Sequence, residues 1–317
     1  MLQDGTFLQN EITEANLKQL LRREGRLSES RICELYDLAC EAADAARTLV
    51  GEGYGVYEVL EILGEGISLT GTPPHSDALD ENLPRISSAI TSAVRQDKVT
   101  FSELLSNVLS ACNIALAEGD FLYDGGGEET FTYVKNKLAD EAYDVFSQEF
   151  IDPRVFYAAS FKEAARAVAD GDAEYCLLPL EERGGARIPS IASILFKEDL
   201  KINSVTPVFG LDGYADMKYA LVSRHFTVPE ISGEDDRYLE LRFVLDSVSL
   251  AEIFSAAEQL GVTVYRANTV VFETEEGDAP CLTVVFKKNG GDFVTLLTYL
   301  TLFFPSYTAV GIYCNLE

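Results

Sequence analysis

The sequence predicts a multi-domain fold that combines α+β and α/β parts, and three observations support this. Between residues 13 and 118 the apolar residues recur at three- and four-residue spacing, which indicates a bundle of helices. From residue 119 short apolar runs alternate with helical patterns, which is typical of an α/β layer. Residues 237–317 follow the order βαββαβ, the split-βαβ arrangement.

These patterns predict three domains. We expect a helical bundle over residues 1–118, an α/β domain over 119–229 and a βαββαβ domain over 237–317. The charged, breaker-rich stretch PEISGEDD separates the last two.

Within the bundle, several helix ends can be placed. Thr13 is the expected N-cap of a first helix, and Ser28 opens a longer one. The turn-rich stretch Gly71–Pro84 is predicted to be a loop. Thr100 is the expected cap of a helix over Phe101–Ala117.

Composition and charge narrow the function. The net charge of −27 repels nucleic-acid phosphates and anionic lipid headgroups, so we expect neither nucleic acid nor membrane as a partner. No apolar run has the length of a membrane span, and the acidic N-terminus does not resemble a signal peptide. The six cysteines form no CxxC pair, which is typical of a reduced, cytoplasmic protein. With only two histidines, we expect no metal site.

The stretch Ser160–Phe196 organises the α/β part. Its first residues place small apolar side chains on one helix face, and Tyr175–Leu178 is a buried strand that we expect Pro179 to end. Open α/β sheets place ligand crevices at the carboxyl ends of their strands. Polar and glycine residues follow at this end: Glu181, Glu182, Arg183, Gly184, Gly185 and Arg187. Ser190 begins the next helix.

Two readings of this turn stay open. Arg183 and Arg187 bracket Gly184 and Gly185, and two guanidinium groups can hold a carboxylate between them. In the other reading they are solvated and pair with the neighbouring glutamates. Upstream, Gly125–Gly127 precede a predicted helix over Thr130–Phe146 and form either an anion-binding turn or a structural one.

Two stretches resemble the prephenate dehydratase family, in the order of that family. SFKEAARAVADGDAEYCLLPLEE (Ser160–Glu182) is similar to the helix that leads to a "Gly-Val-x-Pro-Ile-Glu-Asn" strand and turn. YDGGGEETFTYVKNKLAD (Tyr123–Asp140) resembles the first glycine turn and helix of the family, which makes Thr130 a ligand-binding candidate. The βαββαβ unit, with TAVGIY at Thr308–Tyr313, is similar to the ACT domain that follows the dehydratase domain.

The resemblance implies an architecture. It covers about residues 119–317 and implies a periplasmic-binding-like α/β lobe followed by a ferredoxin-like ACT domain. The family has two such lobes with prephenate between them, whereas the short distance from Glu182 to the last domain leaves room for one. An ACT-like domain has an exposed sheet edge, so we expect a homodimer through it.

The resemblance also implies site residues. The catalytic "Thr-Arg-Phe" motif of the family falls at Met217-Lys218-Tyr219, and its "Glu-Asn-Ser/Thr" turn falls at Glu181-Glu182-Arg183. The catalytic candidates are therefore Glu181, Glu182, Arg183 and Lys218. The effector-binding motifs of the ACT domain fall at Val248, Ser249 and Leu250 and at Asn268 and Thr269. Ser249 is alternatively the N-cap of its helix.

The resemblance implies a divergent dehydratase-like protein linked to phenylalanine biosynthesis. We expect it to bind an aromatic acid or amino acid, in a ligand-binding or regulatory role. One alternative is an active prephenate dehydratase, a carbon–oxygen lyase that forms phenylpyruvate, water and CO2. Another is a chorismate mutase in the N-terminal helices, with carboxylate-binding candidates Arg22, Arg23, Arg31 and Arg47. None of these activities requires a cofactor.

Overall fold

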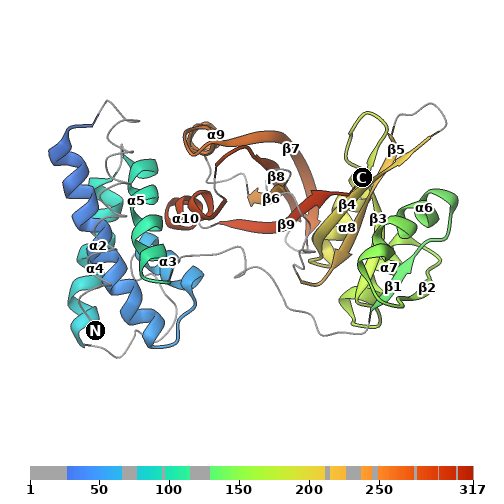
Figure 1. The fold of residues 1–317 in the computed structure, drawn as a ribbon, viewed down its shortest axis with the longest axis horizontal. Coiled ribbons are helices and arrows are strands. Elements are labelled where there is room, and N and C mark those ends of the chain that lie inside the picture. The colour runs from blue at the N-terminus through green and yellow to red at the C-terminus, as the bar shows by residue number, and fades with distance from the viewer. Residues whose placement is uncertain are drawn as a thin grey trace. The chain divides into compact units, whose positions relative to one another are not determined.

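The computed structural model describes residues 27–65, 77–94, 97–114, 129–210, 215–225, 237–244, 249–274, 277–291, 293–304 and 306–316. By its internal contacts the chain divides into two compact units (Figure 1). One unit holds the N-terminal helices together with Leu250–Leu260 and Asp292–Pro305. The other unit holds the described strands. The three predicted domains stay a prediction.

The unit with the N-terminal helices is helical in its described residues. Its described helices are α2 (Glu29–Gly51), α3 (Val56–Glu65), α4 (Asp77–Ala93), α5 (Lys98–Ala111), α9 (Leu250–Gln259) and α10 (Phe293–Phe303). As predicted, α2 begins directly after Ser28, whose hydroxyl accepts the N–H of Arg31. Helix α3 approaches α10 so closely that a Cβ on Gly64 would lie 2.2 Å from the carbonyl oxygen of Leu302.

Two predictions for the N-terminal helices are wrong, and a third lies outside the described residues. Residues 77–84 of the predicted loop are helical, and Pro84 lies inside α4, so that part of the prediction is wrong. Thr100 is not the cap of α5, because the helix begins at Lys98 after Asp97 and Thr100 is buried within it. The helix expected after Thr13 lies outside the described residues.

The described strands of the second unit form one nine-stranded mixed sheet, ordered β2-β1-β3-β5-β4-β9-β6-β8-β7. The strands are β1 (Thr130–Tyr133), β2 (Arg154–Tyr157), β3 (Tyr175–Glu182), β4 (Lys201–Phe209), β5 (Ala215–Ser223), β6 (Arg237–Val244), β7 (Val262–Thr274), β8 (Gly277–Lys288) and β9 (Tyr307–Asn315). The described helices of this unit are α6 (Lys137–Phe146), α7 (Phe161–Ala169) and α8 (Pro189–Lys197), with a short 3₁₀ turn η2 (Ser147–Glu149).

The sheet is continuous because β4 and β9 pair in parallel. Ile202 faces Gly311 at this junction, and a Cβ on Gly311 would lie 2.7 Å from the carbonyl oxygen of Ile202. On one side of the junction, the β9–β6, β6–β8 and β8–β7 pairs are antiparallel, and the element order is βαββαβ. On the other side, parallel β1–β2 and β1–β3 pairs meet the antiparallel β3–β5 and β5–β4 pairs.

The core of this unit lies on both faces of the sheet. Alternate residues of β3 point to opposite faces. Tyr175 and Leu177 join the cluster around α6, whereas Cys176, Leu178 and Leu180 join the cluster around α7 and α8. The second cluster also contains side chains of β6, β8 and β9, so α7 and α8 cover a face that continues across the junction.

Two strand predictions are corrected. Pro179 does not end β3, which continues to Glu182 with a register shift between Pro179 and Glu181. A proline has no N–H for the ladder, and an irregularity at this point accommodates it. Thr130 does not begin a helix, because residues 130–133 form β1 and α6 begins only at Lys137, capped by Asn136.

Candidate functional site

Glu181, near the end of β3, lies in the middle of a cluster of charged side chains, and its residue is only 5% exposed. Arg266 of β7 holds it through two contacts, Nη1 to Oε1 at 2.5 Å and Nη2 to Oε2 at 3.3 Å. Lys218 is its partner on β5, with Nζ 3.8 Å from Oε2. A bidentate arginine contact is among the stronger charge-assisted interactions in proteins.

The turn after β3 brings Arg187 back to Glu181. Gly184 and Gly185 have φ values of +95° and +82°, which side chains other than glycine rarely adopt. The N–H of Glu182 donates to the carbonyl of Ala186 and closes the turn. As a result, Nε of Arg187 lies 3.6 Å from Oε1 of Glu181.

Arg187 also reaches β6 and β9. Its Nη2 contacts Oε2 of Glu240, and the hydroxyl of Tyr313 donates to the same oxygen at 3.0 Å. Nη2 of Arg187 lies 3.3 Å from that hydroxyl. We call these six residues the Glu181 cluster: Glu181, Arg187, Lys218, Glu240, Arg266 and Tyr313.

Burial and neighbouring charges shift the pKa of Arg187 and of Tyr313 within this cluster. Burial lowers the pKa of Arg187, but the nearby charges of Glu240 and Glu181 outweigh it and the pKa is raised. Burial, with Glu240 beside it, raises the pKa of Tyr313 well above its usual value, so the hydroxyl stays a donor. Two carboxylates then face three cations, which leaves an excess of positive charge.

The structure brings only some of the predicted site residues together. Glu181, Lys218 and Arg187 meet in the cluster. Glu182 is exposed, and Arg183 is 56% exposed with Nη1 3.7 Å from Asp216. The two arginines of the turn therefore point apart and do not clamp one carboxylate, and Gly184 and Gly185 shape the turn.

The remaining candidates lie elsewhere. Thr130 lies at the opposite end of β3 from Glu181, where its hydroxyl accepts the N–H of Glu174. Asn268 lines a pocket between α8 and the sheet, and Thr269 is exposed. Ser249 and Leu250 stand at the start of α9, and Val248 lies outside the described residues.

The arginines proposed for a mutase do not converge either. Arg31 pairs with Asp97 and Glu34. Arg47 contacts Asp44 and Cys112. Arg22 and Arg23 lie outside the described residues.

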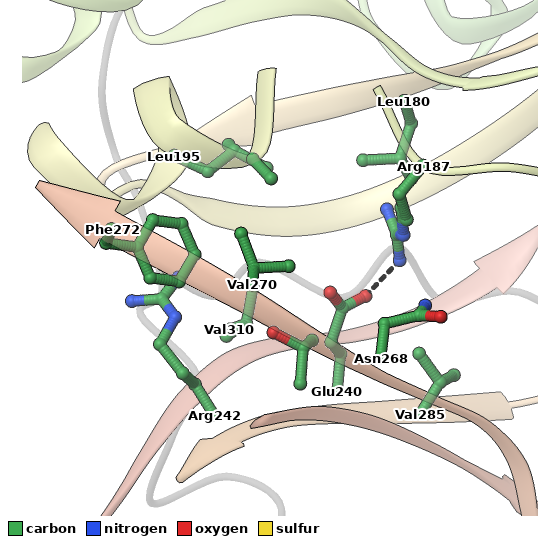
Figure 2. Close-up of a pocket in the computed structure, with 12 residues that line it drawn as sticks. Leu180, Arg187, Leu195, Glu240, Arg242, Asn268, Val270, Phe272, Val285 and Val310 are labelled. Carbon is green, nitrogen blue, oxygen red and sulfur yellow. Dashed lines mark hydrogen bonds and ion pairs between the residues drawn. The ribbon is translucent and has the colours of Figure 1, made fainter. Parts of the chain in front are cut away.

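A pocket lies beside the cluster, between α8 and the face of β9, β6, β8 and β7 (Figure 2). It measures about 480 Å³, including the open space at its mouth. It is lined by Leu180, Arg187, Ala192, Leu195, Glu240, Arg242, Asn268, Val270, Phe272, Thr283, Val285 and Val310. Most of these side chains are apolar, as in small-molecule sites generally.

Sequence reasoning missed four residues of this region: Glu240, Arg242, Arg266 and Tyr313. The strand Tyr238–Phe243 alternates polar and apolar residues, which on its own indicates a solvent-exposed face. In the structure that face is covered and Glu240 and Arg242 are buried. The placement of a Glu and an Arg at alternate positions of this strand was the sequence signal that could have identified Glu240 and Arg242.

The described residues contain neither a membrane-spanning helix nor a group of side chains suited to a metal ion. None of the helices there is long and apolar enough to cross a membrane. Within the same ranges, no group of three His, Cys, Asp or Glu side chains is placed to hold a metal ion.

Comparisons with known proteins find only remote likenesses. No family model and no curated protein matches the sequence. Prephenate dehydratase from Streptococcus mutans is 12% identical over 59% of this chain and 99% of its own, with a TM-score of 0.48. The enzyme from Arthrobacter aurescens, in complex with L-Phe, is 14% identical over 58% of this chain and 89% of its own, with a TM-score of 0.43.

A further solved structure has a different described activity. GqqA, described as a novel type of quorum quenching acylase, is 18% identical over 59% of this chain and 96% of its own, with a TM-score of 0.44. Likenesses with TM-scores below 0.5 do not establish a shared fold. The side chains of this chain itself therefore carry the functional argument.

Proposed function

We propose that this chain is a cytoplasmic small-molecule-binding protein of aromatic amino-acid metabolism. It binds an aromatic acid or amino acid in a regulatory role and does not dehydrate prephenate. The order of its dehydratase-like and ACT-like sequence motifs supports the metabolic setting. The engagement of Lys218 and Arg266 by Glu181 supports binding without dehydration.

The pairing of Glu181 is the observation that carries the proposal. A dehydratase needs free cations for the two carboxylates of prephenate and a group that assists loss of the hydroxyl. Here Lys218 and Arg266 are engaged by Glu181, and Met217 has no hydroxyl to offer. Breaking a buried ion pair costs about 3–5 kcal/mol, so a substrate does not displace Glu181 without a large loss of binding energy.

One observation favours the alternative of an active dehydratase. A second cavity of about 240 Å³, open solvent included, adjoins the cluster. Lys218, Tyr238, Tyr265 and Asn315 are among its lining residues. The excess positive charge of the cluster would there face a bound anion. No such cavity supports a chorismate mutase among the described residues of α2, where Arg31 and Arg47 do not converge.

One pair of assays decides between these functions. The purified chain is incubated with prephenate, and phenylpyruvate is followed; chorismate is the second substrate. We expect no turnover, together with a rise in melting temperature with phenylalanine, tyrosine or phenylpyruvate at millimolar concentration. Turnover that is lost in Lys218→Met and kept in the exposed Glu182→Gln control would establish the dehydratase instead. Absence of both turnover and any shift would reject both proposals.

We further propose a homodimer through residues 237–317. Strand β7 is at the edge of the sheet and carries the exposed side chains of Tyr265 and Val271, the latter 59% exposed. An edge strand with exposed apolar residues favours pairing with another chain. Light scattering should give a dimer mass for the native chain and a monomer mass for Val271→Lys. A native monomer would contradict this proposal.

A further inference from the structure

Three polar side chains form a row across the floor of the large pocket. Arg242 on β6 is the register partner of Thr283 on β8, and Thr283 is the register partner of Asn268 on β7. Directly opposed residues on antiparallel strands have Cα atoms about 4.5–5.5 Å apart, and their side chains share a face. All three line the pocket. We call them the Arg242 row.

Arg242 is buried, and within the described ranges its side chain has no polar partner. The residue is 8% exposed, and its Nε has no hydrogen-bond partner. Among the described residues neither its guanidinium nor the side chains of Thr283 and Asn268 make a hydrogen bond or ion pair. Buried polar groups in folded proteins are nearly always hydrogen-bonded, so an unpaired cation in this position requires an explanation.

The groups around Arg242 only partly compensate its charge. Its Cζ lies 4.7 Å from the ring centroid of Phe196 and 5.1 Å from that of Phe272, and these two rings stack on each other. Glu240 lies two residues along the same strand, but its Oε2 is engaged by Arg187 and Tyr313. Burial is the main reason that the pKa of Arg242 is lowered, and a guanidinium still keeps its proton in proteins.

The walls of the pocket define what could neutralise this charge. Leu195 of α8, Val270 and Phe272 of β7 and Val310 of β9 give an apolar enclosure (Figure 2). A planar carboxylate matches the donor fork of a guanidinium, and the Thr283 hydroxyl and Asn268 amide add donors in the same row. A second anionic group on the ligand would meet the carboxylate of Glu240 in the same cavity.

We propose that the Arg242 row binds the carboxylate of a small monocarboxylic acid whose apolar body packs against Phe272, Val270 and Leu195. This proposal rests on the proposed small-molecule-binding function and names the site and ligand class for it. The site selects a ligand with one carboxylate, because Arg242 supplies one unpaired cation and the carboxylate of Glu240 lies nearby as a fixed anion. A dicarboxylate and inorganic phosphate bind more weakly for the same reason.

Titration calorimetry on the intact chain tests this, with phenylpyruvate, phenylalanine and benzoate as monocarboxylate probes. Prephenate and inorganic phosphate are the multiply charged comparisons. We expect the best monocarboxylate to bind at least tenfold more tightly than either of these. Arg242→Met should weaken that binding at least thirtyfold, and Arg242→Lys should weaken it less, since a charge remains without the planar fork. Arg166→Met removes an arginine of α7 that pairs with Glu198 and should leave the dissociation constant unchanged.

Each outcome has a defined meaning. Binding that is unchanged in Arg242→Met overturns this inference and leaves the proposed function standing. Phosphate binding as tight as that of the monocarboxylates overturns the ligand class. No binding of any probe overturns both the inference and the proposed function. Should Arg242→Met fail to fold, Thr283→Val and Asn268→Leu serve as the test variants. Each is expected to weaken binding of the monocarboxylate threefold or more.

Discussion

Arg187 and Glu240 form a buried ion pair that joins the turn after β3 to strand β6. The side chains are 13% and 5% exposed, and 53 residues separate them in sequence. The pair links the two halves of the sheet on the face that also forms the large pocket. The pair therefore fixes two residues that line the pocket. It also engages Glu240, which is then not available to pair with Arg242.

Breaking this pair should be costly. Arg187→Met leaves Glu240 buried beside Tyr313 without its cation, and we expect the free energy of unfolding to fall by about 3–5 kcal/mol. Urea denaturation measures it. The double variant Arg187→Met/Glu240→Leu should recover much of the loss, because no unpaired charge remains. A double variant as unstable as the sum of the single ones would show that the pair is not coupled.

Tyr313 predicts a loss of stability at high pH. Its folded-state pKa is raised, mainly by burial and then by the charge of Glu240. A raised pKa means that the stabilisation is fully present below the unfolded pKa of about 10 and is lost as the pH rises toward the folded pKa. Chemical denaturation between pH 8 and about 11 should show that the free energy of unfolding falls less for Tyr313→Phe than for the native chain. Equal slopes would remove Tyr313 as a cause.

Gly311 predicts how tightly the two halves of the sheet are joined. A Cβ there would meet the carbonyl oxygen of Ile202, so Gly311→Ala should push β9 away from β4. We expect a loss of about 1–3 kcal/mol, as for other overpacked sites. Gly51→Ala in α2 is the matched control, since a Cβ at Gly51 meets nothing within 4 Å and should be neutral or stabilising. Equal effects at the two glycines would contradict the close approach at Gly311.

Replacement of Arg242 by an apolar residue should stabilise the ligand-free protein. Replacing a buried unpaired ion by an apolar side chain of similar length removes its desolvation cost, so Arg242→Met should raise the free energy of unfolding by about 1–4 kcal/mol. Thermal melting of the ligand-free protein measures this. Arg187→Met should move in the opposite direction, because Arg187 has partners. A destabilised Arg242→Met would indicate that the aromatic contacts of Phe196 and Phe272 outweigh the desolvation cost.

Local pattern determined most of the elements. Ser28 marks the start of α2 because a hydroxyl can accept a first-turn N–H, a purely local interaction. The short apolar runs at β2, β3 and β4 became strands for the same kind of reason, since alternation and β-branched content act within a few residues. Glu181 and Lys218 were both identified as site candidates, and they meet as cross-strand neighbours.

Distant pairing decided what local pattern could not. Pro84 lies inside a helix that the turn-rich sequence did not predict, and Thr130 begins a strand that pairs with β2 and β3. Arg183 and Arg187 look equivalent in sequence, yet one is exposed and the other is buried against Glu240. The turn at Gly184 and Gly185 and the position of β6 made that difference.

The sequence by itself determined most of the described helices and strands, the acidic balance of the chain and the charged turn after β3. Only the tertiary structure decided that β4 pairs with β9 and that the polar face of β6 is covered, with Arg242 inside a pocket. The physical reason is the distance along the sequence over which each effect acts. Propensity and periodicity act over a few residues, whereas burial of Arg242 depends on α8 and β7, which lie far from it in sequence.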